Sequence, residues 1–286
     1  MIDKKPPWVK KRILNLDGYK KTNDILKTEK VNTVCHSARC PNIHECFARS
    51  HVTFMILGSV CTRQCSFCSV KKDKIEAPSD ETKNIVRAVR KLNLKYVLIT
   101  SPTRDDLTDG GASYFVKVAE ALKSEVENIK VEVLVPDFQG NEESIARVVE
   151  SGVDVFAHNI ETVKRLYVEV RPKADYNLSL SILKKAGELR KDVVIKSSIM
   201  LGLGEAREEV EETLRDLRAV GTNSVCLGQY LAPSKMCTAV KKYVTPEEFN
   251  YFYEYALNLG FKFVISQTWA RSSYQADLNM SRAAAL

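Results

Sequence analysis

Short hydrophobic runs alternate with amphipathic segments along most of the chain. The runs are rich in β-branched residues, and they predict strands over residues 53–58, 96–101, 131–135, 153–159, 193–201, 223–228 and 261–266. The segments between them place apolar residues at helical spacing, and Thr245, Pro246 and Glu248 mark the capped start of a late helix. Six or so successive strand and helix units predict an α/β fold with parallel strands joined by right-handed crossovers.

This α/β pattern fits either a barrel or an open, doubly wound sheet. No glycine-rich dinucleotide-binding fingerprint follows the first strand, so a barrel is favoured. The active face of such a barrel lies at the carboxyl ends of its strands. We therefore expect functional residues in the loops that follow the strands.

Composition and charge narrow the class of protein. Of the 286 residues, 44% are hydrophobic and 28% are charged, which is typical of a globular chain and excludes extended disorder. No apolar run approaches the ~20 residues of a membrane helix, and charges and prolines occupy residues 1–11, so we expect a cytoplasmic protein. The net charge is +7, and the first thirty residues hold nine Lys or Arg against four Asp or Glu. This basic leader is either an arm for an acidic partner or a solvated segment.

Six of the eight cysteines lie within thirty-four residues, which points to metal binding. Thiols stay reduced in a cytoplasmic chain, so clustered cysteines are better interpreted as metal ligands than as disulfides. Cys61, Cys65 and Cys68 form a C-x3-C-x2-C pattern directly after the first predicted strand. Three thiolates on one loop can hold three irons of a cubane and leave the fourth iron open. Structural zinc is the alternative, but it usually takes four ligands in two C-x2-C pairs, and the chain has no second pair.

The C-x3-C-x2-C pattern, with an aromatic residue before its last cysteine, resembles that of the radical S-adenosylmethionine (SAM) superfamily. The resemblance implies a partial (β/α)6 barrel of the TIM type. It also implies that the open iron of a [4Fe-4S] cluster binds the methionine end of SAM. An electron from the reduced cluster then releases a 5′-deoxyadenosyl radical, which removes hydrogen from an unactivated carbon.

A second cysteine group resembles the lipoyl synthase family. Cys35, Cys40 and Cys46 form C-x4-C-x5-C, and the tail carries an R-S-S-Y motif at residues 271–274. In that family the three cysteines bind an auxiliary [4Fe-4S] cluster with a serine of the tail, which implies Ser273 as the ligand and Ser272 as the alternative. The likeness continues at residues 5–8, 54–58, 99–101, 104–111, 136–138, 158–162, 170–172, 196–197, 200–205 and 228–231.

The resemblance also implies a domain organisation and a reaction. Residues 1–50 would carry the auxiliary-cluster cysteines, residues 51–245 the barrel, and residues 246–286 a helix, a strand and the R-S-S-Y tail. The reaction would be insertion of two sulfur atoms, at C6 and C8, into an octanoyl chain linked to a lysine of a carrier. The auxiliary cluster would supply the sulfur, so the enzyme is a sulfurtransferase with two [4Fe-4S] clusters and SAM as cofactors.

The partners follow from the same reaction. The carrier would be the lipoyl domain of a 2-oxoacid dehydrogenase acyltransferase subunit or the H protein of glycine cleavage. Ferredoxin or flavodoxin would supply electrons, and neither a membrane nor a nucleic acid is expected to take part.

The candidate SAM contacts are polar or flexible residues at the expected strand ends. Hydroxyls can lie beside the cluster loop, amide and carboxylate groups can bind a ribose or an ammonium group, and a guanidinium can pair with a carboxylate. Two glycines permit a close approach of an adenine edge to the backbone. These residues are Thr100, Ser101, Asn159, Glu161, Arg171, Gly202 and Gly204.

Several positions have a structural interpretation beside the functional one. Lys196 is either a pocket residue or an exposed strand end, and residues 104–106 are either part of the pocket or a solvated turn. Cys226 is expected in the core. No catalytic role is assigned to the four histidines, His36, His44, His51 and His158.

The chain also departs from the family pattern near the expected pocket. The departures are Ala157, Ser198, Cys237 and the pair Gln267 and Thr268. They leave open another radical SAM enzyme with an auxiliary cluster and a different substrate. A rival of another class is a metal-stabilised, non-enzymatic module whose basic arm binds nucleic acid.

Overall fold

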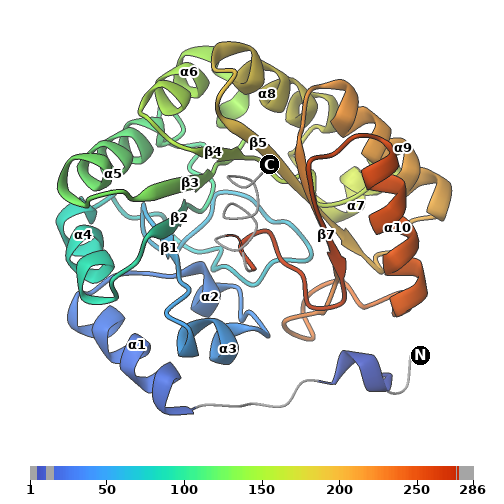
Figure 1. Ribbon diagram of the computed structural model, residues 1–286, viewed down its shortest axis with the longest axis horizontal. Helices are drawn as coiled ribbons and strands as arrows, with labels where there is room; N and C mark the ends of the chain where they lie inside the picture. The colour runs from blue at the N-terminus through green and yellow to red at the C-terminus, as the bar shows by residue number, and fades with distance from the viewer. Residues whose placement is uncertain (1–4, 11–15, 275, 277–286) are drawn as a thin grey trace.

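One parallel sheet of seven strands organises the molecule. A computed structural model describes residues 5–10, 16–274 and 276. The strands pair in chain order: β1 (Thr53–Met55), β2 (Tyr96–Thr100), β3 (Lys130–Leu134), β4 (Val155–Ala157), β5 (Val194–Leu201), β6 (Ser224–Gln229) and β7 (Phe263–Gln267). The sheet curves into a partial barrel (Figure 1). The expected α/β barrel is confirmed.

Helices cover the outside of this curved sheet (Figure 1). The outer helices are α4 (Thr82–Lys91), α5 (Ala112–Glu125), α6 (Glu142–Glu150), α8 (Tyr176–Leu189), α9 (Arg207–Ala219) and α10 (Pro246–Asn258). Their apolar faces pack on the sheet because their buried positions recur at helical spacing. The capped start of α10 is confirmed, since the Thr245 side chain accepts a hydrogen bond from the backbone N–H of Glu248.

Further helices lie outside this regular strand and helix alternation. Three belong to the N-terminal part of the chain, namely α1 (Leu16–Thr28), α2 (Val34–Ser37) and α3 (Ile43–Ala48). Helix α7 (Tyr167–Val170) follows β4, and 3-10 turns occupy Pro7–Val9, Phe138–Gly140 and Lys164–Leu166.

The seven strands correspond to the seven hydrophobic runs of the sequence pattern. Strand β7, which the sequence analysis placed in the C-terminal segment, pairs in parallel with β6 from Phe263 onwards. The β1 edge carries an antiparallel bridge from Thr33 to Phe54. Helices α2 and α3 and the chain after β7 lie between the two outer strands (Figure 1). The N-terminal segment of α2 and α3 and the chain after β7 thus meet at the opening of the barrel.

A buried ion pair lies inside the barrel. The Nζ atom of Lys196 is 2.8 Å from Oε1 of Glu132, and the Tyr96 hydroxyl donates to the same carboxylate. Lys196 is therefore not the exposed strand end that the sequence allowed. Cys226 is buried in β6, as expected for a core residue.

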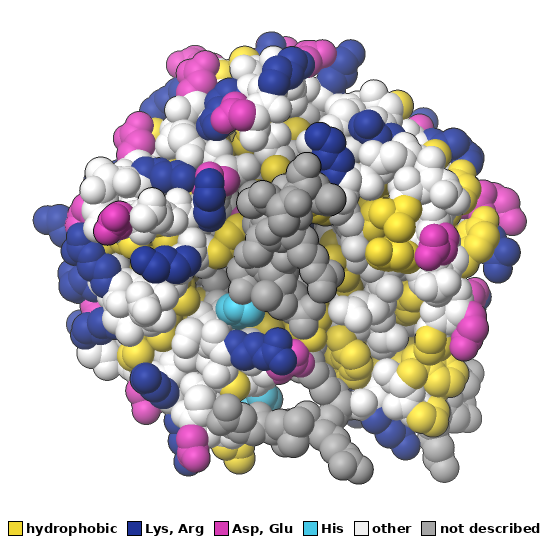
Figure 2. Space-filling view, viewed as in Figure 1, with side chains coloured by type: hydrophobic (Ala, Val, Ile, Leu, Met, Phe, Trp, Pro, Cys, Tyr) yellow, Lys and Arg dark blue, Asp and Glu magenta, His cyan; other side chains and the backbone are white. Residues whose placement is uncertain are grey.

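The described part of the basic leader packs on the barrel. The indole Nε1 of Trp8 donates to the carbonyl of Val244 at 3.2 Å, and the Val9 side chain is buried. On the face drawn in Figure 2, Lys and Arg side chains are interspersed with Asp and Glu around the rim. No helix in the described part of the chain is long and apolar enough to cross a membrane.

Candidate functional site

The loop with Cys61, Cys65 and Cys68 leaves the carboxyl end of β1 through a sharp turn. Leu57 and Gly58 both adopt positive φ angles, 66° and 81°, which redirect the chain above the barrel. The three cysteines are partly buried. Burial raises the pKa of the Cys68 thiol to about 12, so cluster binding must displace a proton from a neutral thiol.

An ion-pair network fastens this loop to the next two strands. Arg63 lies inside the cysteine motif, is 7% exposed, and donates to both carboxylate oxygens of Asp105 at 2.9 Å. It also donates to Oδ1 of Asp137 at 2.7 Å. Burial by itself raises the pKa of Asp137, but the hydrogen bond and charge of Arg63 outweigh burial and lower it. The network holds the cysteine loop in one position relative to β2 and β3.

The turn at residues 104–106 belongs to this arrangement. Arg104 is buried, pairs with Asp106, and donates to the carbonyl of Leu57 at 3.2 Å. Arg104 is therefore not the solvated residue that the sequence allowed, whereas its partner Asp106 is exposed.

Polar side chains from the loop after β4 lie opposite the cysteine loop. Asn159 donates to Oε1 of Glu161 at 3.1 Å, and Nη1 of Arg171 donates to the Tyr167 hydroxyl at 2.8 Å. Burial raises the pKa of Cys65, and the charge of Arg171 opposes this rise. The two sets of residues are thus close enough to interact electrostatically.

Two of the expected SAM contacts carry a buried polar atom that has no hydrogen-bond partner within the described part of the chain. These atoms are Oγ of Ser101 and Nε of Arg171. A buried donor without a partner is costly, so a polar ligand that bonds these atoms would be stabilised there. The chemistry of both groups fits the carboxylate and ammonium of an amino-acid ligand.

Three of the expected SAM contacts, Thr100, Gly202 and Gly204, make close contacts with other residues of the chain. The Thr100 hydroxyl donates to the carbonyl of Leu134 at 2.8 Å. A Cβ atom on Gly202 would meet Gln229 and the carbonyl of Lys242 at 2.4 Å, so packing within the chain already requires a glycine there. Gly204 lies beside the Lys241 side chain. The adenine-edge role of the two glycines remains a prediction.

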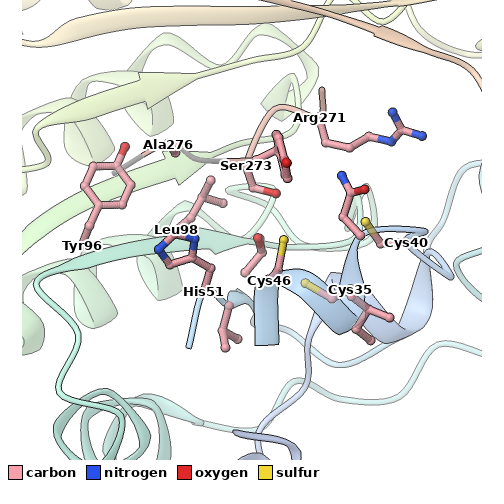
Figure 3. A pocket seen from close by; sticks show the side chains of 14 residues that line it. Cys35, Cys40, Cys46, His51, Tyr96, Leu98, Arg271, Ser273 and Ala276 are labelled. Carbon is pink, nitrogen blue, oxygen red and sulfur yellow. The ribbon is translucent and has the colours of Figure 1, made fainter. Parts of the chain in front are cut away.

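The second group of cysteines lines a pocket at the opening of the barrel. Cys35, Cys40 and Cys46 reach it from the α2–α3 segment, and Ser273 reaches it from the chain after β7 (Figure 3). Tyr96 also lines it. Burial raises the pKa of Cys35 to about 12. Three thiols and one hydroxyl are the donor set expected for the auxiliary cluster.

Contacts across the pocket hold the tail in place. The Asn42 side chain donates to the carbonyl of Trp269 at 2.7 Å, and the Tyr274 hydroxyl donates to Glu45 at 2.9 Å. Ser272 points elsewhere, because its hydroxyl donates to Oδ1 of Asn159 at 3.1 Å. Adjacent serines therefore face two different sites.

Neither group of cysteines forms a site for a single ion. Within the described residues, no three His, Cys, Asp or Glu side chains converge closely enough to hold one metal ion. A cubane needs wider spacing, because each cysteine binds a different iron.

Some residues of these sites were missed in the sequence. Arg63 lies between two cysteines and Asp137 belongs to a matched segment, but only the fold shows that they pair. His51 lines the cysteine pocket, and its position five residues after Cys46 was the only signal. His158 is structural, as expected: its ring bonds the carbonyl of Val135 and the Ser179 hydroxyl, and burial lowers its pKa to about 4.

The fold and the cysteine loop define a class of protein. Residues 55–217 match the Radical SAM superfamily. A methylornithine synthase has the same fold, with a TM-score of 0.55 at 17% identity over 85% of this chain and 74% of its own. Streptococcus suis SuiB bound to S-adenosylmethionine gives a TM-score of 0.60 at 14% identity over 87% of this chain and 61% of its own.

Full-length relatives narrow the class further. The chain is 50% identical to a lipoyl synthase of Caldicellulosiruptor saccharolyticus, over 97% of this chain and 98% of that protein. It is 47% identical to the lipoyl synthase of Aquifex aeolicus, over 93% and 97% of the two chains. The chain belongs to the lipoyl synthase family.

Membership in this family confirms what the motifs implied about the activity. The chain is a radical SAM enzyme that inserts sulfur, with SAM and [4Fe-4S] clusters as its cofactors. The relatives favour neither a different radical SAM substrate nor a nucleic-acid-binding module. The chain departs from the family pattern at Ala157, Ser198, Cys237 and residues 267–268. Its identity to the Caldicellulosiruptor saccharolyticus protein is nevertheless 50%.

Proposed function

We propose that the two cysteine groups divide the lipoyl synthase reaction between them. Cys61, Cys65 and Cys68 hold the cluster that binds SAM, and the pocket with Ser273 holds the auxiliary cluster. When bound, the first cluster supplies the electron that cleaves SAM, and the second supplies the sulfur atoms. The observation that carries this proposal is the position of Ser273, which lines the pocket of three cysteines although more than two hundred residues separate them.

Ser273 gives the auxiliary site its chemical character. An alkoxide is a harder ligand than a thiolate and releases iron more readily. This suits a cluster that must give up sulfide. Ser272 serves the SAM side of the barrel instead, since it positions the Asn159 amide.

The residues around the cysteine loop hold SAM and the loop itself. Nε of Arg171 and Oγ of Ser101, which have no partner among the described residues, would donate to the SAM carboxylate. Glu161 and Asn159 would bind its ammonium or ribose. Arg63 keeps the loop fixed through its two carboxylates. A fixed geometry matters because the reacting carbon must stay within contact distance of both sites.

The apolar walls of the auxiliary pocket suit an octanoyl chain. Ile43, Val52 and Leu98 line it beside the cysteines. An eight-carbon chain gains free energy by leaving water for such a surface, and the same walls keep water from a reactive carbon. The substrate is the octanoyl-lysine of a carrier protein, and sulfur enters at C6 and C8.

The partners and the location complete the proposal. The carrier is the lipoyl domain of a 2-oxoacid dehydrogenase acyltransferase subunit or the glycine cleavage H protein. Electrons come from ferredoxin or flavodoxin in the cytoplasm, without a membrane or a nucleic acid. Residues 1–50 and 246–286 act together on the auxiliary cluster, around the barrel of residues 51–245.

Metal analysis tests the two-cluster assignment. After anaerobic reconstitution, we expect about eight irons and eight sulfides per chain, in two cubanes. The triple variant C35A/C40A/C46A should keep about four of each. An unchanged iron content in this variant would contradict the assignment of the second cysteine group.

A further inference from the structure

Three loops meet at Ser66, which lies between Cys65 and Cys68. The backbone N–H of Ser66 donates to the carbonyl of Val170 at 3.0 Å, in the segment after β4. Its carbonyl accepts from the N–H of Thr238 at 2.9 Å, in the segment after β6. The cysteine loop is therefore joined from outside to two segments that are far apart in sequence.

The two most exposed large apolar side chains of the described residues lie on those segments. Met236 is 94% exposed and Val168 is 88% exposed, whereas the next in order, Leu16, is 54% exposed. Each lies two residues from a hydrogen bond with Ser66. Exposed apolar side chains gathered at one place are typical of a binding surface.

Positive charge surrounds these two side chains. Residues 69–74, 161–175 and 230–243 hold ten Lys or Arg and four Asp or Glu, a net charge of +6. Arg165 and Lys242 pair with Glu209 and Glu248 outside these segments, which leaves a net charge of +4. The segment of residues 230–243 contains Lys235 and no acidic residue. The exposed Lys72 donates to the carbonyls of Cys65 and Cys68 at 3.0 and 3.1 Å. A cation thus lies directly over the cysteine loop.

We propose that this surface docks an acidic electron-transfer protein. The surface, which we term the Ser66 face, consists of Lys72, Val168, Lys173, Lys235 and Met236. The inference rests on the proposed function, because it takes Cys61, Cys65 and Cys68 as the site that must receive electrons. Electron transfer weakens steeply with distance, so a donor must contact the shell that covers those cysteines.

The chemistry of the Ser66 face matches such a partner. Interfaces of electron-transfer proteins are small, weak and steered by charge. Two exposed apolar side chains in segments that also carry Lys173 and Lys235 suit an interface of that kind. An acidic surface complements the net charge of the three segments. The octanoylated carrier, in contrast, must reach the pocket that Cys40 and Ser273 line.

The test compares a protein donor with a chemical one. In reconstituted holoenzyme, the double variant V168E/M236E places carboxylates on the Ser66 face, and L257E alters an exposed apolar residue of α10 as a control. We expect V168E/M236E to bind reduced flavodoxin at least about tenfold more weakly and to lose flavodoxin-driven 5′-deoxyadenosine formation in proportion. The rate with dithionite should stay as in the parent, and L257E should match the parent with both donors.

Salt and carrier binding separate the remaining outcomes. K235E should lessen the salt dependence of flavodoxin binding. Unchanged affinity in V168E/M236E, equal losses in L257E, or no binding of flavodoxin or ferredoxin to the parent would overturn the proposal. So would weaker binding of the octanoylated carrier alone, since it would assign the face to the carrier. Dithionite-driven sulfur insertion reports on the proposed function independently of all these results.

Discussion

The hydroxyl of Ser272 donates to Oδ1 of Asn159 at 3.1 Å and thereby joins the C-terminal tail to the loop after β4. Asn159 in turn donates to the carboxylate of Glu161. The tail therefore reaches both proposed sites through neighbouring residues, because Ser273 faces the pocket of three cysteines. This arrangement links the closing of the auxiliary site to the shape of the SAM site.

Substitutions of the two serines should have different effects. S273A should abolish sulfur insertion while SAM cleavage continues, because the auxiliary cluster loses its labile ligand. S273C should keep a cluster and release its sulfide more slowly, since thiolate binds iron more firmly than alkoxide. Mass spectrometry of the octanoylated carrier and an assay for 5′-deoxyadenosine measure both effects.

S272A is the matched control for this pair. It removes the donor to the half-buried amide oxygen of Asn159, at a cost of about 1 kcal/mol, and should weaken SAM binding with the iron content unchanged. If S273A inserts both sulfurs normally while S272A is inactive, Ser273 is not the ligand.

Cysteines of the two groups should also differ in the step that they support. C65A should lose formation of 5′-deoxyadenosine, because the site loses one of three thiolates. C40A should still cleave SAM but yield no sulfur-containing carrier. Anaerobic assays with each variant, together with electron paramagnetic resonance of the remaining cluster, test this division. Equal loss of cleavage in both variants, with the first cluster intact in C40A, would contradict it.

Local signals in the sequence account for most of the fold. Strand propensity, helical spacing and the Thr245 cap each act within a few residues, so they are readable without the structure. The first strand was predicted over residues 53–58 but ends at Met55, because Leu57 and Gly58 turn the chain towards the cysteine loop. Cysteine spacing is local in the same way.

The pairings across the molecule could not be predicted in this way. Arg63, Asp105 and Asp137 come from three loops, and only the register of β1, β2 and β3 brings them together. The sequence allowed Lys196 to be an exposed strand end, because its partner in the buried ion pair, Glu132, lies two strands away in the sheet. Such contacts depend on the curvature of the whole sheet, which no short segment encodes.

Removal of the Arg63 guanidinium should be strongly destabilising. R63M leaves the buried Asp137 carboxylate without its partner, which should cost about 3–5 kcal/mol of unfolding free energy. The double variant R63M/D137N should recover part of that loss. R165M is the control, because Arg165 pairs with Glu209 at an exposed position, where solvent screening leaves the pair little effect on stability. Anaerobic urea unfolding and iron content measure the effect; equal losses in R63M and R165M would refute it.

Protonation of His158 should set a pH dependence of stability. Burial lowers its pKa to about 4, from 6.5 in the absence of such an environment, and the charges of Arg171 and Arg63 act in the same direction. The folded state therefore holds this ring neutral while the unfolded state binds a proton below about pH 6.5. Stability from this group is fully present above about pH 6.5 and falls by on the order of 3 kcal/mol as the pH drops towards 4.

The variant H158Q should remove this slope. Thermal unfolding of the holoenzyme between pH 7 and pH 4.5, followed anaerobically by circular dichroism, should show a smaller decrease of Tm in H158Q than in the parent. S179A is the control, because it removes one hydrogen bond of the ring, lowers Tm at every pH, and keeps the imidazole and its slope. The neighbouring Asp137 contributes in both proteins, since its carboxylate lies close enough to the ring to influence it. If H158Q and the parent lose the same Tm over this range, the buried histidine is not the group that titrates.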